Sequence, residues 1–146
     1  MFQDSIILTG ALKLVLADAQ GNITDEREVP NLVVTVGKNF IASRMIGATD
    51  NVMSHMAIGT GTTAPAVGNT ALVTEVGRVA LTSNVRTNNA IAYVATFPAG
   101  TGTGAITEAG IFNASSSGTL LCRTTFSVIN KGAADTLGIT WTVTVN

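Results

Sequence analysis

Residues 136–145, which stand just before the last residue of the sequence, alternate strictly between large apolar side chains and small or weakly polar ones. The apolar positions are Leu137, Ile139, Trp141, Val143 and Val145. Because side chains of a strand point alternately to its two faces, this period of two predicts a long strand over residues 136–145 with one buried face. Threonines and one glycine occupy the other face, which suits either water or a second protein surface.

Shorter segments with the same character predict six further strands, and turn residues between several of them indicate hairpins. These strands are expected over residues 11–17, 23–29, 78–85, 91–97, 105–112 and 119–128. Helical spacing predicts one helix that Thr35 caps and that ends at Gly47, with a shorter helical turn over residues 69–76. The expected fold is all-β: an antiparallel β-sandwich or jelly-roll-like domain with one short helix, in a single domain over residues 1–146.

The chain is poor in charge for its size. Only 12% of its residues are charged and 46% are hydrophobic, with a mean hydropathy of +0.41, whereas about 25% are charged in an ordinary soluble domain. Such a surface is easiest to tolerate where neighbouring subunits cover it. The net charge is −1 and no basic run is present, so no nucleic-acid partner is expected.

The single cysteine and the lengths of the apolar runs indicate the cellular compartment of the protein. Cys122 is the single cysteine, which excludes an internal disulfide, and it is predicted to be a small buried residue in a strand. No apolar run approaches the roughly 20 residues that cross a bilayer, and the first residues lack the basic start of a signal peptide. We therefore expect no membrane partner, and a protein made in a cytoplasm and kept there or in a particle assembled there.

Three neighbouring polar residues, Asp50, Ser54 and His55, supply the residue types of an acid, nucleophile and base. A catalytic triad depends on geometry, which three residues of one short segment rarely reach, so His55 is expected at the start of a strand. Two glycine-rich segments, residues 59–64 and 98–104, lack the lysine and the spacing of a phosphate-binding loop. They are predicted to be strand connections, and no catalytic residue is expected.

The acidic residues also favour structural roles. Those between residues 25 and 28 lie on a predicted strand, where neighbouring side chains point to opposite faces, and they are expected to guard a sheet edge. Glu75 and Glu108 stand alone in apolar sequence, and each is expected to pair with an arginine, such as Arg78 for Glu75. No acid spacing matches a calcium loop. Neither a metal nor a cofactor is predicted.

A series of motifs between residues 31 and 145 then carries a family resemblance. The motifs are residues 31–38 (NLVVTVGK), 55–65 (HMAIGTGTTAP), 69–78 (NTALVTEVGR), 95–100 (ATFPAG), 106–114 (ITEAGIFNA) and 118–123 (GTLLCR). Their order resembles a group of small tailed-phage virion proteins, whose relatives occur as free-standing structural proteins and as attachment domains of tail fibres. The resemblance implies fold roles for these residues: special turns at Gly59, Gly61 and Gly110, and core positions for Leu72, Ile111 and Phe112.

Three functions compete. The favoured one is a capsid decoration or cement protein on the outer capsid surface, which binds the major capsid protein and forms a homodimer or homotrimer. Residues 1–7 are then either an apolar arm, with Phe2, Ile6 and Ile7 as contacts to the capsid or a neighbouring subunit, or simply the start of the first strand. The alternative is a tail component, either a fibre adaptor or a baseplate or collar protein; no fibre repeat follows the last strand, which argues against a fibre itself. A carbohydrate-active enzyme would need aromatic platforms and paired acids, which one Trp and one Tyr do not provide.

Overall fold

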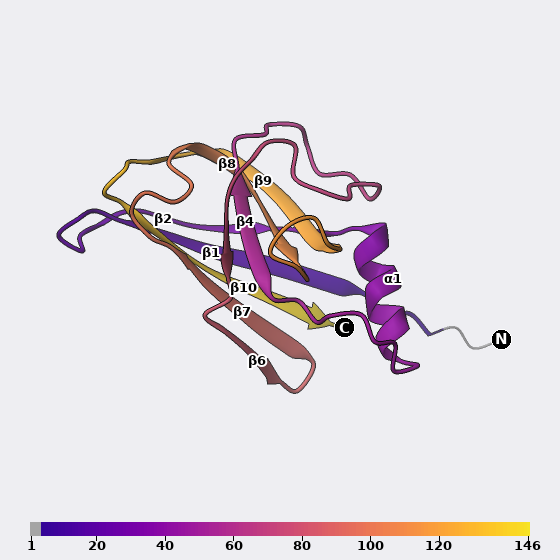
Figure 1. Ribbon diagram of the computed structural model, residues 1–146. Helices are drawn as coiled ribbons and strands as arrows, with labels where there is room; N and C mark the ends of the chain where they lie inside the picture. Colours follow the sequence, from indigo (N-terminus) through magenta and orange to yellow (C-terminus); the bar gives the residue numbers. More distant parts are fainter. Residues whose placement is uncertain (1–3) are drawn as a thin grey trace.

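The computed structural model describes residues 4–146 and consists of ten strands in two antiparallel sheets, with one helix at one end (Figure 1). The first sheet has the order β2 (Ile23–Pro30), β1 (Leu8–Ala17), β10 (Thr136–Val145), β7 (Ala90–Phe97) and β6 (Ser83–Thr87). The second sheet has the order β3 (Leu32–Val33), β9 (Leu120–Lys131), β8 (Gly104–Phe112), β4 (His55–Gly59) and β5 (Glu75–Ala80). The predicted all-β sandwich with one short helix is confirmed.

The alternating C-terminal strand, β10, forms the centre of the first sheet. It pairs with β1 on one side and β7 on the other, which places Trp141 between Leu12 and Tyr93. Trp141 is fully buried, and the predicted apolar face of β10 packs into the core between the sheets. A buried aromatic ring of this size contributes several kcal/mol through the apolar surface that it removes from water.

The central strand of the second sheet, β8, is covered on both faces. Seven consecutive residues of β8, Ile106–Phe112, are buried, so this strand lacks the alternation of a half-exposed strand. Its inner face joins the main core, whereas Phe112 and Leu72 belong to a smaller apolar cluster on the outer side. The loop that carries Leu72 therefore acts as a lid on the sheet, and the predicted core positions of Leu72, Ile111 and Phe112 are confirmed.

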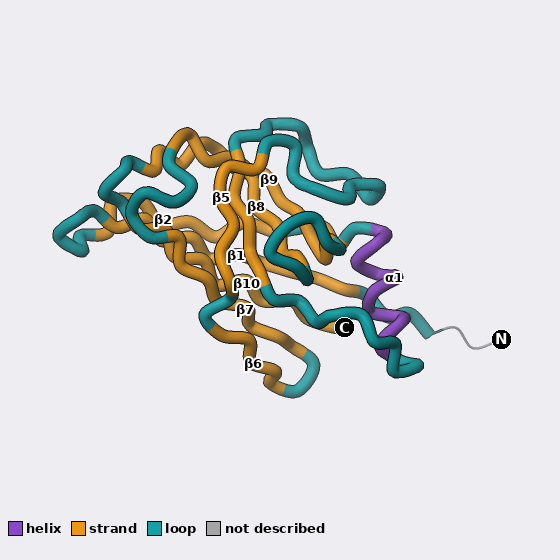
Figure 2. Tube along the Cα trace, viewed as in Figure 1, coloured by secondary structure: helices purple, strands orange, loops and turns teal. Residues whose placement is uncertain are grey.

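Two segments differ from the sequence prediction. The strand expected over residues 78–85 is two strands, because the chain passes from the second sheet to the first between β5 and β6. The helical turn expected over residues 69–76 is an extended loop leading into β5. Here the N–H groups of Val73 and Thr74 donate to the Glu108 carboxylate, which satisfies them without a helix. The teal loop segments of Figure 2 show how much of this region has no regular structure.

The helix α1 (Thr35–Arg44) covers the end of the sandwich where the chain termini lie (Figure 1). The prediction that Thr35 caps this helix is wrong. Val34 is the cap, and Thr35 is the first helical residue, which donates its N–H to the Val67 carbonyl at 2.8 Å. After the helix the chain turns through Gly47, at a φ of 70° that glycine adopts readily. Inside the helix, a Cβ at Gly37 would collide with the Leu121 carbonyl, so glycine lets α1 approach β9 closely.

Candidate interface at the terminal end of the sandwich

Both ends of the described chain leave the sandwich on the same side. Ile7 and Asn146 exchange two backbone hydrogen bonds, of 2.9 and 2.7 Å, which extend the pairing of β1 with β10. Asn89, in the turn between β6 and β7, bonds to Val145 on the other side of β10. We call this side the terminal end: residues 4–8, α1 with the following loop to residue 54, the turn at residues 88–89, and residues 143–146 (Figure 2).

Exposed apolar side chains gather at the terminal end. It holds six of the twelve large hydrophobic residues that the described chain exposes: Ile6, Ile7, Met45, Ile46, Val52 and Val145. The side chain of Ile46 is 87% exposed and that of Met45 is 84% exposed, so neither contributes to the hydrophobic core. An apolar surface of this kind is a candidate for contact with another protein.

An apolar groove of about 230 Å³ opens between α1 and the ends of the strands. Its lining comes from five elements and consists of Leu8, Phe40, Ile41, Arg44, Ile91, Tyr93, Leu121, Val143 and Val145. Arg44 is the one charged residue in this set. Water needs two to four polar partners to occupy a cavity favourably, and this lining offers few. The groove therefore suits an apolar side chain better than solvent.

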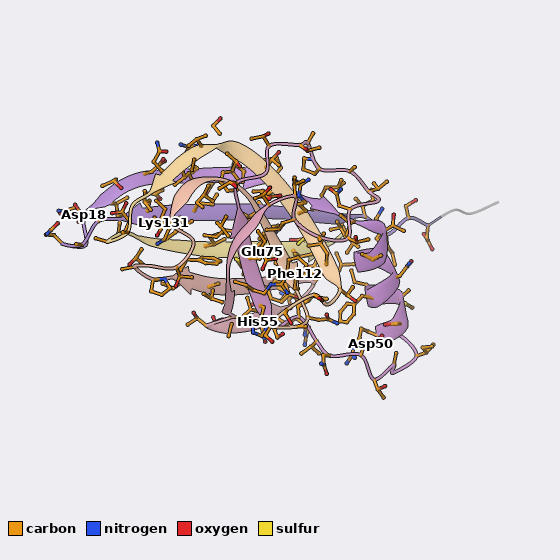
Figure 3. The ribbon with its side chains drawn as sticks, turned by 45° about the horizontal axis from the view of Figure 1, so that its top comes forward. Asp18, Asp50, His55, Glu75, Phe112 and Lys131 are labelled. Atoms are coloured by element: carbon orange, nitrogen blue, oxygen red, sulfur yellow. The ribbon has the colours of Figure 1, made fainter. Side chains whose placement is uncertain are left out.

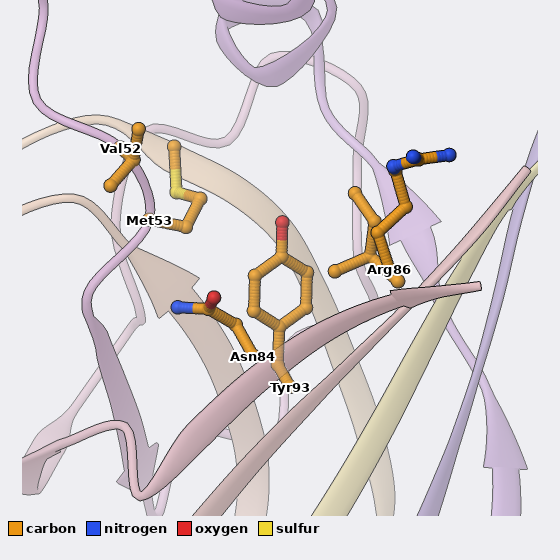
Figure 4. A pocket seen from close by; sticks show the side chains of 6 residues that line it. Val52, Met53, Asn84, Arg86 and Tyr93 are labelled. Atoms are coloured by element: carbon orange, nitrogen blue, oxygen red, sulfur yellow. The ribbon is translucent and has the colours of Figure 1, made fainter. Parts of the chain in front are cut away.

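A second hollow of about 220 Å³ lies beside the groove and shares Ile91 and Tyr93 with it. Figure 4 shows the Tyr93 ring between Asn84 and Met53 on one side and Arg86 on the other. Burial, with a smaller effect of Cys122, raises the pKa of Tyr93 to about 12. Its hydroxyl thus stays protonated at neutral pH and can donate a hydrogen bond to a partner.

Two arginines stand at these hollows without a carboxylate partner within the described chain. Arg44 donates to the backbone carbonyls of Ala48 and Asp50, and Arg86 donates to that of Asn88. The other three arginines each form an ion pair with an acid. The two hollows therefore combine apolar walls with two arginine side chains, which fits a partner segment that carries both an apolar side chain and a carboxylate.

The residues nominated from the sequence as contacts fall partly on this surface. Ile6 is 77% exposed and Ile7 58%, and both lie at the terminal end, whereas Phe2 lies outside the described residues. Ile7 continues the strand pairing through Asn146, while residues 4–6 carry no regular structure. The contact itself stays a prediction. No local pattern in the sequence pointed to Arg86 or to the groove.

Two residues of the possible triad, Ser54 and His55, are in contact, but Asp50 does not join them. Ser54 Oγ lies 2.8 Å from His55 Nδ1, at the start of β4 as expected for His55. Asp50 lies on the loop after α1 (Figure 3), and no hydrogen bond joins its carboxylate to His55 in the described structure. Residues 4–146 contain no group of three His, Cys, Asp or Glu side chains placed to hold a metal ion. Over the same residues, no helix is long and apolar enough to cross a membrane.

Both lone glutamates form the ion pairs that the sequence predicted. Glu75 pairs with Arg78 at 2.7 Å, and Glu108 pairs with Arg123 at 2.8 Å. The acidic hairpin also behaves as predicted: β2 is an edge of the first sheet, where Asp25 pairs with Arg27. The charged side chains of β2 discourage pairing of another strand along this edge.

Glu108 is the centre of a buried network that the sequence did not reveal. Its carboxylate accepts N–H groups of Gly61, Val73 and Thr74 at 2.7–3.0 Å, in addition to the Arg123 guanidinium. Burial alone raises the pKa of this carboxyl, but these hydrogen bonds outweigh burial and hold the pKa below its usual range. The glycine-rich segment 59–64 thus contacts an anion, and that anion is the protein's own Glu108.

The prediction of special turns at three glycines is wrong. These positions require glycine because neighbouring atoms leave no room for a side chain. None of Gly59, Gly61 and Gly110 has a positive φ. A Cβ at Gly61 would lie 2.5 Å from Glu108 Oε1, and one at Gly110 would lie 2.9 Å from a Leu120 methyl group. These positions therefore exclude side chains because the loop and the neighbouring strands approach them closely.

Lys131 is a further buried charged residue whose burial the sequence did not predict. It is 2% exposed and donates to the carbonyls of Pro98 and Asp135, at 3.0 and 2.7 Å. Figure 3 shows it on the side of the sandwich away from α1, toward the tip that carries Asp18. Lys131 thus joins two turns at the end opposite to the terminal end.

Comparison with known proteins gives one match. The family model described as "Phage tail-collar fibre protein, N-terminal" matches residues 26–145, from within β2 to the last residue of β10. No curated protein and no solved structure matches the chain significantly. The match includes every motif on which the resemblance to phage virion proteins rests, and it covers most of the chain. The chain therefore belongs to the phage tail-collar fibre protein N-terminal family and is a structural protein of a phage virion.

Proposed function

We propose that this protein is a tail component without catalytic activity, which fastens one part of the phage tail to another through its terminal end. The family match over residues 26–145 carries the proposal, because that family is described by its place in tail-collar fibres. The alternative that the sequence left open, a fibre adaptor, baseplate or collar protein, is therefore favoured over capsid decoration. The partner is then a tail or collar subunit and not the major capsid protein.

The geometry of the terminal end supports a docking role. The exposed apolar residues, the groove and the unpaired arginines lie on one side of a rigid sandwich. Attachment needs such a preorganised surface, because a partner that binds to it orders few additional groups. The outer face of β10 offers a second weakly polar surface, with Thr140, Thr142 and Thr144 exposed or half-buried.

The non-catalytic role rests on the arrangement of the side chains that could act as an acid, a base or a nucleophile. In the described structure Asp50 is not bonded to His55, and the Glu108 carboxylate is sealed inside the fold by Arg123. General acid–base catalysis requires a titratable group within reach of a substrate. The groove holds apolar residues and one arginine, which suits protein binding better than proton transfer.

Separated phage parts test the location. We would purify virions of the phage that encodes this chain, separate tails from heads, and quantify the protein in each fraction against a tail protein and the major capsid protein. A tail component should accompany the tails in about six to eighteen copies, set by the symmetry of the tail.

The control is the same measurement on heads assembled without tails. A decoration protein would stay with these heads in hundreds of copies per particle, comparable with the major capsid protein. That result would overturn the tail proposal and restore the capsid interpretation. Presence in the tail fraction alone, at low copy number, would support it.

A further inference from the structure

We infer that the groove beside α1 binds residues 4–7 of a second copy of this chain, with Ile6 in the groove and Asp4 against Arg44. The inference rests on the proposed docking role of the terminal end and names its partner segment. Three observations carry it: an unfilled apolar groove, an exposed apolar segment at the same end of the molecule, and opposite charges on the two.

The groove has the shape and lining of a receptor for an aliphatic side chain. Phe40 and Ile41 of α1 form one wall, and Val143 and Val145 of β10 belong to the sheet beneath. These residues come from a helix and a central strand, so the groove exists before a partner arrives. Burial of one isoleucine there would remove apolar surface of both partners from water.

Among the described residues, hydrogen bonds hold residues 4–7 at Ile7 alone. All four residues are exposed, and the backbone bonds between Ile7 and Asn146 direct the chain along the line of β1. Figure 1 shows this segment leading away from the body beside α1. No turn interrupts residues 4–7, so the segment as described does not return to the groove of its own copy.

The spacing of the segment matches the groove. In an extended chain, residues two apart point to the same side, about 7 Å from each other. When the segment binds in an extended conformation, Asp4 and Ile6 therefore share a side, and Ile7 points away from it. An isoleucine in the groove would bring the aspartate to the rim, where Arg44 stands with Arg86 in the neighbouring hollow.

The charges complement each other within one sequence. Neither Asp4 nor Arg44 has an ion-pair partner among residues 4–146. Arg44 uses one terminal nitrogen, Nη1, for the carbonyls of Ala48 and Asp50, which leaves Nη2 and Nε for a carboxylate. A carboxylate placed there gains a charge-assisted hydrogen bond, and it fixes the register of the segment in the groove.

Light scattering of the purified full-length chain over a range of concentrations tests self-association. Ile6→Asn should weaken it at least about tenfold, because the variant removes the side chain that fills the groove. Ile23→Asn is the matched control: Ile23 is 62% exposed on β2, outside the terminal end, and its loss should change nothing. A wild-type chain that remains monomeric, or equal effects of the two variants, would overturn the inference.

A charge exchange tests the register. Asp4→Arg and Arg44→Asp should each weaken association, and the double variant should regain it. Thermal unfolding of each variant checks that the loop at Ala48 and Asp50 has kept its structure. If the double variant binds no better than the single ones, Asp4 does not meet Arg44 and the inference fails.

Cross-linking identifies the occupant independently of these substitutions. A copy with Ile6→Cys, mixed with a size-tagged copy with Val145→Cys, should form a disulfide between the two chains, whereas Ile23→Cys should not. If no disulfide joins the two chains, or if Ile23→Cys forms one equally well, the inference fails. If the protein does not self-associate but still accompanies the tails, this inference is wrong and the proposed function stands. If the protein self-associates but does not accompany the tails, the proposed function is wrong and this inference stands.

Discussion

Glu108 and Arg123 form an ion pair of 2.8 Å in which both side chains are completely buried. They lie on the neighbouring strands β8 and β9, and the carboxylate also accepts three backbone N–H groups from the loop over residues 60–74. Arg123 in turn donates to the Thr63 carbonyl and to Asn69 Oδ1. One buried pair therefore holds in place the loop that covers the second sheet.

Glu108→Gln should destabilise the protein strongly. The substitution leaves the Arg123 charge buried without a counter-charge and turns one hydrogen-bond acceptor of the network into a donor. Loss of one partner of a buried ion pair costs about 3–5 kcal/mol. Urea unfolding followed by tryptophan fluorescence would report this loss as a lower midpoint, because Trp141 lies in the core.

The matched control is Glu26→Gln. Glu26 pairs with Lys13 at 3.0 Å, but about half of each side chain is exposed, so solvent already screens this pair. We expect its unfolding midpoint to stay at the wild-type value. A mild effect of Glu108→Gln, similar to that of Glu26→Gln, would show that the buried network does not hold the loop.

The same carboxyl predicts a loss of stability in acid. The pKa of Glu108 in the folded state lies below the ordinary value of 4.5, so the unfolded state binds more protons as the pH falls. Its contribution is complete above about pH 5 and disappears as the pH drops through the folded-state pKa. The free energy of unfolding, measured from pH 6 to pH 3, should fall more steeply in the wild type than in Glu108→Gln.

Some slope should remain in that variant. Hydrogen bonds, chiefly from the Asn22 N–H, lower the pKa of Asp18 as well, and this residue is unchanged by the substitution. Identical slopes in the two proteins would contradict a lowered pKa for Glu108.

Gly61→Ala should destabilise the loop through a steric conflict. The added methyl group would lie 2.5 Å from both Glu108 Oε1 and Val73 Cβ, and overpacking of this kind costs about 1–3 kcal/mol. Gly68 lies on the same loop with open space around it and no positive φ, so Gly68→Ala should be neutral or stabilising by up to about 1 kcal/mol. Thermal unfolding of the two variants compares them directly, and a harmless Gly61→Ala would contradict the close approach.

Cys122 should be inert in the folded protein. It is completely buried in β9, and burial raises the pKa of its thiol well above the ordinary range, so little reactive thiolate forms. Reaction with a thiol reagent should be slow in native buffer and rapid in denaturant. Fast labelling of the native protein would mean that β9 opens locally at its pairing with β3.

The sequence predicted those parts of the fold that depend on short-range patterns. The alternation of residues 136–145 identified β10 and its buried face, since strand geometry alone relates that pattern to structure. It failed at residues 78–85, where the passage from one sheet to the other has no local signal. It also failed at residues 69–76, because the groups that satisfy the backbone there belong to Glu108, more than thirty residues away.

The candidate interface was predictable only in part. The sequence nominated Ile6 and Ile7 as contacts, and both are exposed at the terminal end, while the contact itself stays a prediction. The groove did not, since its lining combines residues from β1, α1, β7, β9 and β10 that only the folded chain brings together. Likewise, the lack of a carboxylate partner at Arg44 and Arg86 is a property of distances and not of residue order.

The hydrogen bonds between Ile7 and Asn146 have a mechanical consequence. Tension applied between these two residues would peel β1 from β10 one rung at a time, beginning with the pair nearest the pull, and each rung would resist alone. A force that reaches the sandwich through its flank, by contrast, is shared among many rungs at once. A load on this domain should therefore be carried across its faces, and not through its two strand ends.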